Sequence, residues 1–391
     1  MSVAAYPTGE LGDIADLYDS LHQTPTYANN GYPMIRVTDI RRGFLDTTNA
    51  MKVSKDVYEL FSKKYKPIIG DILFSRVGSY GNSTFVDKGT AICLGQNTVC
   101  ISPDRMKINP MFLYSALNSE DLFHQVKSFV GGASQGTISL KSIRKLQVPV
   151  PPLPTQKRIA GILSAYDELI ENSQRRIKIL ETMARALYRE WFVHLRFPGY
   201  ENHPRVASAL GDIPQGWEVK KLGSVVDISW GDTSITKASY VKEGYTAYSA
   251  SGSDGKLDHY DFNRLGIVLS AIGAQCGKTW LAHDKWSCIK NTIRFWSIDE
   301  CVTTEFLFIA TEGQEFWPRR GAAQPFISQG DAQRIDLLIP DLATMKRFTT
   351  FSTASLKRIA TLEHQIQNLR RTRDLLLPRL LSGQINVEAA D

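Results

Sequence analysis

The second half of this chain repeats the order of residues in the first half. The run GASQGTIS at 132–139 returns as GAAQPFIS at 321–328, an offset of 189 (321 minus 132). The same offset aligns PPLPTQKR at 151–158 with PDLATMKR at 340–347. This period is far longer than the roughly 20–50 residues of stacked-repeat proteins. The chain therefore contains two copies of one domain, and two copies indicate two similar tasks.

The part of each copy that precedes the aligned proline run is rich in glycine and aromatic residues. The β-branched runs at 90–94 and 266–270 predict strands, and the glycines between such runs predict turns. Short helices are predicted at 110–117 and at the matching positions 304–311. The fold class that we expect is mixed α/β (α+β).

A long helix is predicted to follow this part in each copy. The extended run VPVPPLP at 148–154 cannot continue a helix, and Thr155 then offers an N-cap. Beyond it, apolar residues recur in alternating steps of three and four, which is the heptad pattern of a coiled coil. The seam residues that we expect to pack helix on helix, or to dock a partner, are Ile170, Ile177, Leu180, Leu187, Trp191, Ile359, Leu362, Ile366, Leu369 and Leu376.

Two such helices of about 30 residues each would form an antiparallel coiled coil of about 45 Å and hold the two domains apart. Arg373 stands in the second helix where Ala184 stands in the first, so the two seams can be complementary rather than identical. The alternative is that each helix is an ordinary amphipathic helix that lies on a domain core.

The composition excludes some classes of protein but does not by itself identify the class of this one. A length of 391 residues with 43% apolar residues indicates more than one core. The net charge of +6 suits a nucleic-acid partner but also suits many enzymes. The five cysteines contain no C-x-x-C pair, and we find neither an apolar signal segment nor a membrane-length apolar run. We therefore expect a cytoplasmic protein that does not contact a membrane.

Three stretches resemble the specificity subunits of type I restriction-modification systems. The stretch 151–192, from PPLPTQKRIA through DELIEN to LYREWF, is similar to their first conserved region. GDIPQGWEVKKLG at 211–223 resembles the opening of their second recognition domain, and NLRRTRDLLLPRLLSG at 368–383 resembles their C-terminal helix. The resemblance implies target-recognition domains at 1–154 and 199–343, and spacer helices at 155–198 and 344–391.

The same resemblance implies a non-catalytic, DNA-binding subunit of a restriction system and DNA methylation complex, without a cofactor or a metal. Each domain would read one half of a bipartite double-stranded DNA target, and the helices would set the spacing. The implied partners are two methyltransferase (modification) subunits and, in assemblies that cleave DNA, restriction (motor-nuclease) subunits.

Loop residues that suit DNA contacts occur as clusters in both domains. Cations and hydroxyls suit phosphates, whereas amides, guanidinium groups and acids suit base edges. In the first domain the predicted contacts are Arg36, Thr38, Asp39, Arg41, Arg42, Ser75, Arg76, Ser79, Tyr80 and Gln135. In the second domain they are Ser249, Ser251, Ser270, Gln275, Lys278 and Gln324. A turn or surface role is the alternative for any single one of them.

Two features qualify this prediction. Ala271 stands where Arg76 stands in the first domain, so we expect the two half-sites to differ in sequence. Asn97 and Asn291 occupy matching places before β-rich runs, at an offset of 194 (291 minus 97), and an Asx-turn is the favoured interpretation there.

Near matches to catalytic motifs do not support an enzyme. GAQCGKT at 273–279 lacks one residue between the glycines of a phosphate-binding loop, and NPMF at 109–112 lacks the second proline of an adenine-methyltransferase motif. The nuclease-like EVK at 218–220 has no upstream acid, and no histidine or cysteine set has zinc-binding spacing. A self-contained DNA-modifying enzyme and a stand-alone DNA-binding regulator remain the alternatives.

Overall fold

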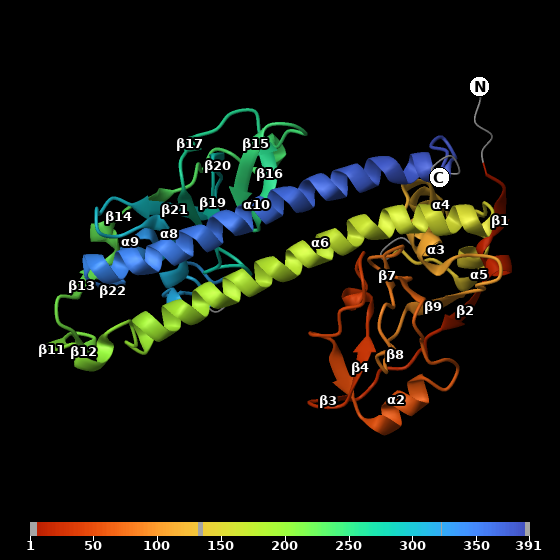
Figure 1. Ribbon diagram of the computed structural model, residues 1–391, viewed down its shortest axis with the longest axis horizontal. Coiled ribbons are helices and arrows are strands. Elements are labelled where there is room, and N and C mark those ends of the chain that lie inside the picture. Colours follow the sequence, from red (N-terminus) through yellow and green to blue (C-terminus); the bar gives the residue numbers. More distant parts are fainter. Residues whose placement is uncertain (1–5, 132–135, 322, 388–391) are drawn as a thin grey trace. The chain divides into compact units, whose positions relative to one another are not determined.

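The computed structural model describes residues 6–131, 136–321 and 323–387 (Figure 1). The chain divides into two compact units. Unit 1 comprises Met1–Arg175 and Glu363–Asp391, and unit 2 comprises Arg176–Leu362. Unit 1 contains the first copy of the repeated domain and unit 2 contains the second, each with a part of both long helices.

The first domain, which lies in unit 1, combines two four-stranded sheets and one two-stranded sheet with short helices. Its elements are β1 (Thr8–Glu10), α1 (Leu11–Ile14), β2 (Ala15–Asp19), β3 (Tyr27–Ala28), β4 (Tyr32–Ile35), η1 (Val37–Asp39), β5 (Met51–Val53), α2 (Lys55–Phe61), β6 (Ile72–Ser75), β7 (Ser83–Phe85), β8 (Cys93–Leu94), β9 (Thr98–Pro103), α3 (Pro110–Leu117), α4 (Glu120–Phe129), α5 (Leu140–Arg144) and β10 (Gln147–Pro149). One four-stranded sheet is antiparallel, in the order β2-β9-β6-β7. The other has the order β3-β5-β4-β8, and its β4–β8 pair is parallel.

The second domain, which lies in unit 2, repeats this plan. Its elements are η2 (Arg189–Val193), η3 (Tyr200–Asn202), β11 (Arg205–Ser208), β12 (Gly211–Pro214), β13 (Glu218–Lys221), α7 (Leu222–Val225), β14 (Val226–Trp230), η4 (Lys237–Ser239), β15 (Tyr245–Ser249), β16 (Gly252–Leu257), β17 (Phe262–Asn263), β18 (Gly266–Ser270), β19 (Thr279–Ala282), β20 (Lys285–Cys288), β21 (Thr292–Ser297), α8 (Thr304–Ala310), η5 (Gln314–Phe316), α9 (Gln329–Gln333) and β22 (Asp336–Ile339). The sheet β14-β21-β18-β19 matches β2-β9-β6-β7, and the parallel β15–β20 pair matches β4–β8.

The predicted mixed α/β class is confirmed, with differences in detail. The short helices α3 and α8 begin at the predicted residues, where Asn109 and Thr303 accept N-cap hydrogen bonds. Of the predicted strand at 90–94, only Cys93–Leu94 pairs, because β8 bonds only to the short β4. The strand predicted at 266–270 is β18, and its residues are all buried.

Two long helices follow the domains, and both begin earlier than the sequence suggested. α6 spans Leu153–Tyr188 rather than beginning after Thr155, since a proline such as Pro154 is tolerated in the first turn. α10 spans Leu342–Leu381, and the Asp341 carboxylate accepts the Ala343 and Thr344 amides at 2.9 and 3.0 Å. Burial alone would raise the pKa of Asp341, but these hydrogen bonds, with those from the Thr344 and Trp217 side chains, lower it overall.

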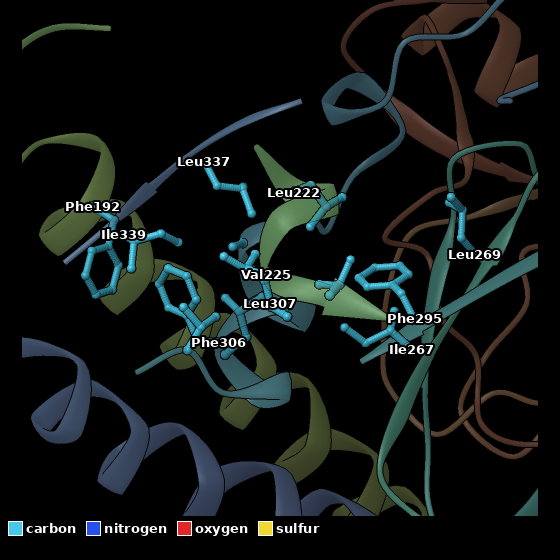
Figure 2. Close-up of a cluster of buried hydrophobic side chains, with 14 of the residues drawn as sticks. Phe192, Leu222, Val225, Ile267, Leu269, Phe295, Phe306, Leu307, Leu337 and Ile339 are labelled. Atoms are coloured by element: carbon cyan, nitrogen blue, oxygen red, sulfur yellow. The ribbon is translucent and has the colours of Figure 1, made fainter. Parts of the chain in front are cut away.

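Each unit has one main core that joins its domain to the long helices. In unit 1 the buried cluster includes Phe74 of the sheet, Phe112 of α3, Leu163 of α6 and Leu377 of α10. In unit 2 the matching cluster includes Phe295 of the sheet, Phe306 of α8, and Phe192, which follows α6 (Figure 2). The helices are therefore integral parts of the units, because their apolar faces complete the domain cores.

Candidate nucleic-acid interface

The loop between β6 and β7 in the first domain is held at both of its ends. The Ser75 amide donates to the Asn82 carbonyl at 2.9 Å, and the Gly81 amide donates back to Ser75 at 3.0 Å. A second loop lies against it, because the Ile138 amide donates to the Arg76 carbonyl at 3.1 Å. These bonds fix the backbone at the base of the loop while Ser79 at its tip stays exposed.

The second domain builds the same pair of loops with the same bonds. The Ser270 amide donates to Lys278 at 2.8 Å, the Gly277 amide donates to Ser270 at 2.9 Å, and the Ile327 amide donates to Ala271 at 2.8 Å. Gly78 and Gly273 occupy matching turn positions with φ of 69° and 95°, a conformation that favours glycine. The two copies therefore share a backbone framework at these loops.

Asn97 and Asn291 close the framework through their backbones. They adopt φ of 63° and 69°, in the left-handed region that asparagine tolerates better than most residues. Their carbonyls accept the Arg76 and Ala271 amides at 2.9 and 3.0 Å. These backbone contacts give both asparagines a structural role, whereas the predicted Asx-turn, which needs the side-chain oxygen, stays a prediction.

A third segment of each domain follows the strand that pairs in parallel. The Gly95 amide donates to Ile35 at 2.8 Å in the first domain, and the Ile289 amide donates to Tyr248 at 2.9 Å in the second. Arg36 and Ser249 come directly after these two strand residues, which makes them structural counterparts. The segments that carry Arg36 and Thr38, and Ser249 and Ser251, are therefore equivalent parts of the two domains.

The Arg36 segment is charged and internally paired. The Arg36 Nε donates to the Asp39 carboxylate at 2.9 Å, and the Arg36 amide donates to the same carboxylate at 3.0 Å. The hydrogen bond that Arg36 donates to the Asp39 carboxylate raises the pKa of Arg36. The guanidinium is therefore a fixed cation, half-buried at the edge of the domain.

The Ser249 segment has its own polar cluster. The Asp254 carboxylate accepts from Ser249 Oγ at 2.8 Å, from the Tyr240 hydroxyl at 2.9 Å, and from Lys237. Burial would raise the pKa of Asp254, but the hydrogen bonds from Lys237, Ser249 and Tyr240 lower it overall. The Asp254 side chain is thus held as a carboxylate beside the exposed Ser251.

The strongest chemical difference between the domains lies at the end of β2 and β14. Arg76 donates to both oxygens of Asp19 at 2.8 and 2.9 Å, and its Nε donates to the Ile138 carbonyl. Asp19 pairs with Val99 in the sheet, and Trp230 pairs with the matching Ile293. The second domain therefore has Ala271 and an exposed Trp230 where the first has the Arg76–Asp19 ion pair.

The structure brings most of the predicted DNA contacts of each domain together. The exposed or half-buried members at these loops are Arg36, Thr38, Asp39, Arg76, Ser79, Tyr80, Ser251, Gln275, Lys278 and Gln324. Ser75, Ser249 and Ser270 are buried, and their hydroxyls donate to groups within their own domain. Arg41 is exposed, and Gln135 lies outside the described residues.

Arg42 differs from its sequence neighbours. Its guanidinium lies 3.1 Å from the Asp374 carboxylate of α10, rather than beside the loop that follows β6. Sequence reasoning also missed Trp230, Lys237 and Asp254. The offset of 211 (222 minus 11) that aligns Leu11 with Leu222 also aligns Asp19 with Trp230, and the charged turn after Ser249 was a signal for Asp254.

The predicted seam residues lie on the inner faces of the long helices. In unit 1, Ile170 and Ile366 are buried, and Leu369 and Leu376 are half-buried. In unit 2, Ile359 and Leu362 are buried, whereas Ile177, Leu180, Leu187 and Trp191 are half-buried against the main cluster. Within unit 1, the ion pair of Arg373 with Asp167 joins α10 to α6 directly.

Among the described residues, no group of three or more histidine, cysteine, aspartate or glutamate side chains is placed to hold a metal ion. None of the helices in the described ranges is both long and apolar enough to cross a membrane.

Comparison with solved structures supports the fold. The S subunit of the type I restriction-modification system from M. genitalium is 16% identical, with a TM-score of 0.61 over 97% of each chain. At this identity the likeness concerns the fold alone.

Sequence comparisons give the family. A specificity subunit assigned to the type I restriction enzyme MjaX of Methanocaldococcus jannaschii is 29% identical over 248 residues, which is 60% of this chain and 57% of that relative. The MjaIX specificity subunit of the same organism is 24% identical over 71% of this chain and 69% of its own length. The family model described as the type I restriction modification DNA specificity domain matches residues 6–182 and 214–370. With both halves matched, this chain belongs to the family of type I restriction-modification DNA specificity proteins.

Proposed function

We propose that this chain is the non-catalytic, cytoplasmic subunit that selects the DNA sequence for a type I modification complex, with each domain reading one half of a bipartite target. The observation that carries the proposal is the duplicated loop framework around Arg76 and Ala271, which repeats one geometry in two domains. Equivalent loops on duplicated domains favour two related half-sites over one continuous site. The differing side chains on these loops favour two different sequences.

The exposed loop residues suit the two kinds of contact that DNA recognition requires. The cation Lys278 and the hydroxyls of Thr38 and Ser251 suit phosphates, which position a protein on the duplex. The amide of Gln275 and the guanidinium of Arg36 suit base edges in the major groove. The methyl transfer itself would come from partner methyltransferase subunits, and cleavage from restriction subunits where the assembly contains them.

Exposed apolar residues on α6 support the docking of a partner helix. Ile162 and Leu169 are exposed in the part of α6 within unit 1, one heptad apart (162 to 169). Ile179 and Met183 are exposed in the part within unit 2, at i and i+4. An amphipathic helix of a methyltransferase subunit would cover such residues and shield them from water.

The proposal is tested by co-expressing the chain with the methyltransferase gene next to its own and mapping methylated bases across the host genome. We expect a motif of two short specified blocks separated by a fixed unspecified gap. A continuous motif, or methylation that does not depend on this chain, would contradict the proposal and favour a stand-alone regulator.

The docking step has a separate test with a matched control. Leu169→Glu should abolish co-purification with the methyltransferase, because a charge would replace a covered apolar contact. Leu60→Glu, a change at an equally exposed leucine of the first domain, should leave co-purification intact. Equal behaviour of the two variants would exclude this part of α6 as the docking surface.

A further inference from the structure

A chain of ion pairs in unit 1 connects the first domain to both long helices. The Arg42 guanidinium lies 3.1 Å from Asp374 Oδ1 on α10. The neighbouring Arg373 donates to the same oxygen at 3.0 Å through Nη2 and at 3.1 Å through Nε. Through Nη1, Arg373 also pairs with Asp167 on α6. One carboxylate oxygen thus receives two guanidinium groups, one from the domain and one from the helix seam.

The inner part of this network is buried and the outer part is accessible. The side chains of Arg373 and Asp167 are 9% and 13% exposed, whereas those of Arg42 and Asp374 are 35% and 51% exposed. A cavity of about 590 Å³ lies beside the network, lined by the 42–46 segment and by residues of both helices. A buried arginine is stable only beside carboxylate partners. The positions of Asp167 and Asp374 therefore define where the Arg373 guanidinium lies between the two helices.

The segment that begins at Arg42 is also fixed from the side of the domain. The Gly43 amide donates to the Tyr114 hydroxyl at 2.7 Å, and the Phe85 amide donates to the Gly43 carbonyl at 3.0 Å. The Leu45 amide donates to Phe85 at 2.9 Å. The 3-10 turn η1, which presents Thr38, lies only a few residues before Arg42. The segment therefore runs directly from the proposed DNA-facing turn to the helices.

The matching positions in unit 2 are built differently. Ala184 and Leu356 occupy the places of Arg373 and Asp167, by the offset of 189 (373 minus 184, 356 minus 167), and both are buried in the apolar cluster. Arg185 stands where Asp374 stands, and it makes two hydrogen bonds of 2.7 Å to Glu312. Each domain is thus tied to the same helix position, but with charges of opposite sign.

We infer that Arg42, Asp374, Arg373 and Asp167 form a positioning network that sets the orientation of residues 36–46 on the helices. This orientation in turn sets the length of the gap between the two DNA half-sites that the protein accepts. Arg42 then acts as a positioning residue rather than a DNA contact. The statement about the gap rests on the proposed function, whereas the statement about orientation concerns the free chain.

The orientation is tested by hydrogen exchange of the full chain, read by mass spectrometry over residues 36–46. Arg42→Glu and Asp374→Arg each replace an attraction with a repulsion, and each should speed exchange of the Gly43 and Leu45 amides about fivefold. The double variant restores opposite charges and should return exchange toward the native rate. The control is Arg371→Glu, which makes the charge change of Arg42→Glu at an exposed neighbour of Asp374 on α10. Single variants whose Gly43 and Leu45 amides exchange as slowly as those of this control would contradict the proposed network.

The gap is tested with the same variants in complex with the methyltransferase subunits. DNA duplexes carry the target with its native gap and with one base pair added or removed. The single variants should lose discrimination against the altered gaps about fivefold, and the charge-exchanged double variant should recover it. Variants that change hydrogen exchange over residues 36–46 but leave discrimination against the altered gaps unchanged would overturn the proposal that the network sets the gap. A native complex that modifies no bipartite target would instead refute the proposed function, while the exchange result would still decide the network.

Discussion

In the first domain, the strand that ends at Asp19 supplies a carboxylate to Arg76, whereas in the second domain the matching strand ends at an exposed Trp230 and Ala271 replaces the arginine. The backbone around both positions is the same. The Arg76 and Ala271 amides each donate to the carbonyl of a left-handed asparagine, and their carbonyls each accept from the second loop. The comparison teaches that the duplicated framework is kept in the backbone, while the chemistry offered to a ligand changes in the side chains.

The helices show the same contrast between the two units. Unit 1 pairs the buried Arg373 with the half-buried Asp167 at positions where unit 2 buries Ala184 and Leu356. A pair of charges and a pair of apolar side chains thus occupy equivalent positions. Exchanging only one member of a pair between the two units would destabilise either unit, because a buried charge without its partner is costly.

The largest expected effect comes from breaking the charged arrangement. Arg373→Ala should lower the free energy of unfolding by about 3–5 kcal/mol, because the largely covered Asp167 carboxylate would lose its guanidinium partner. The double change Asp167→Leu with Arg373→Ala copies the residues of unit 2 and should recover most of this loss. Urea denaturation measures both. A double variant no more stable than Arg373→Ala would show that the unit 1 helices do not accept the apolar pair.

The next effect concerns sequence recognition. Trp230→Asp combined with Ala271→Arg would place the ion pair of the first domain into the second. Because these positions lie on the proposed recognition loops, the base preference of one half-site should change by about 1–3 kcal/mol in discrimination, and the other half-site should keep its sequence. Competition binding of the assembled complex to a library of half-site variants gives the answer. A changed preference in both half-sites would contradict the assignment of one half-site to each domain.

Most of the fold could be predicted from the sequence because its signals are local or repeated. The offset of 189 between the two copies gave the duplication, and the short helices predicted at 110–117 and 304–311 begin at the predicted residues. The start of α6 was placed too late, because Pro154 reads as a helix breaker although it is tolerated in a first turn. The strand at Cys93–Leu94 was predicted too long because its length depends on a partner strand distant in sequence.

The candidate site was less predictable, since residue type alone does not reveal which side chains the fold pairs internally. Arg42 was grouped with Arg36, yet its partner is Asp374, far along the chain. Ser75 and Ser270 looked like hydroxyls for DNA, but both end buried strands and donate to nearby carbonyls. Trp230 was missed because residue type did not mark it as a contact, although the offset of 211 that aligns Leu11 with Leu222 also aligns Asp19 with Trp230.

A smaller effect tests whether the shared framework depends on its left-handed residues. Asn97→Ala and Asn291→Ala should each cost about 1–2 kcal/mol, because alanine disfavours a positive φ. The corresponding changes to glycine should cost less, since glycine adopts this conformation readily. Thermal or urea denaturation distinguishes the two substitutions at each position. Equal costs for alanine and glycine would indicate that the asparagine side chains, rather than the backbone conformation, hold the loops.

The smallest effect compares the two domain cores at matching helices. Phe306 of α8 packs against the rings of Phe192 and Phe348, with centroids at 5.2 and 6.0 Å, whereas no ring pair involves Phe112 of α3 among the described residues. Phe306→Leu should therefore cost about 0.5–1.5 kcal/mol more than Phe112→Leu, because it also removes edge-to-face ring contacts. Both phenylalanines are fully buried, so the loss of apolar area is matched between the variants. Equal losses in urea denaturation would mean that the ring contacts add nothing beyond burial and that the two cores, unlike the two loop surfaces, are energetically interchangeable.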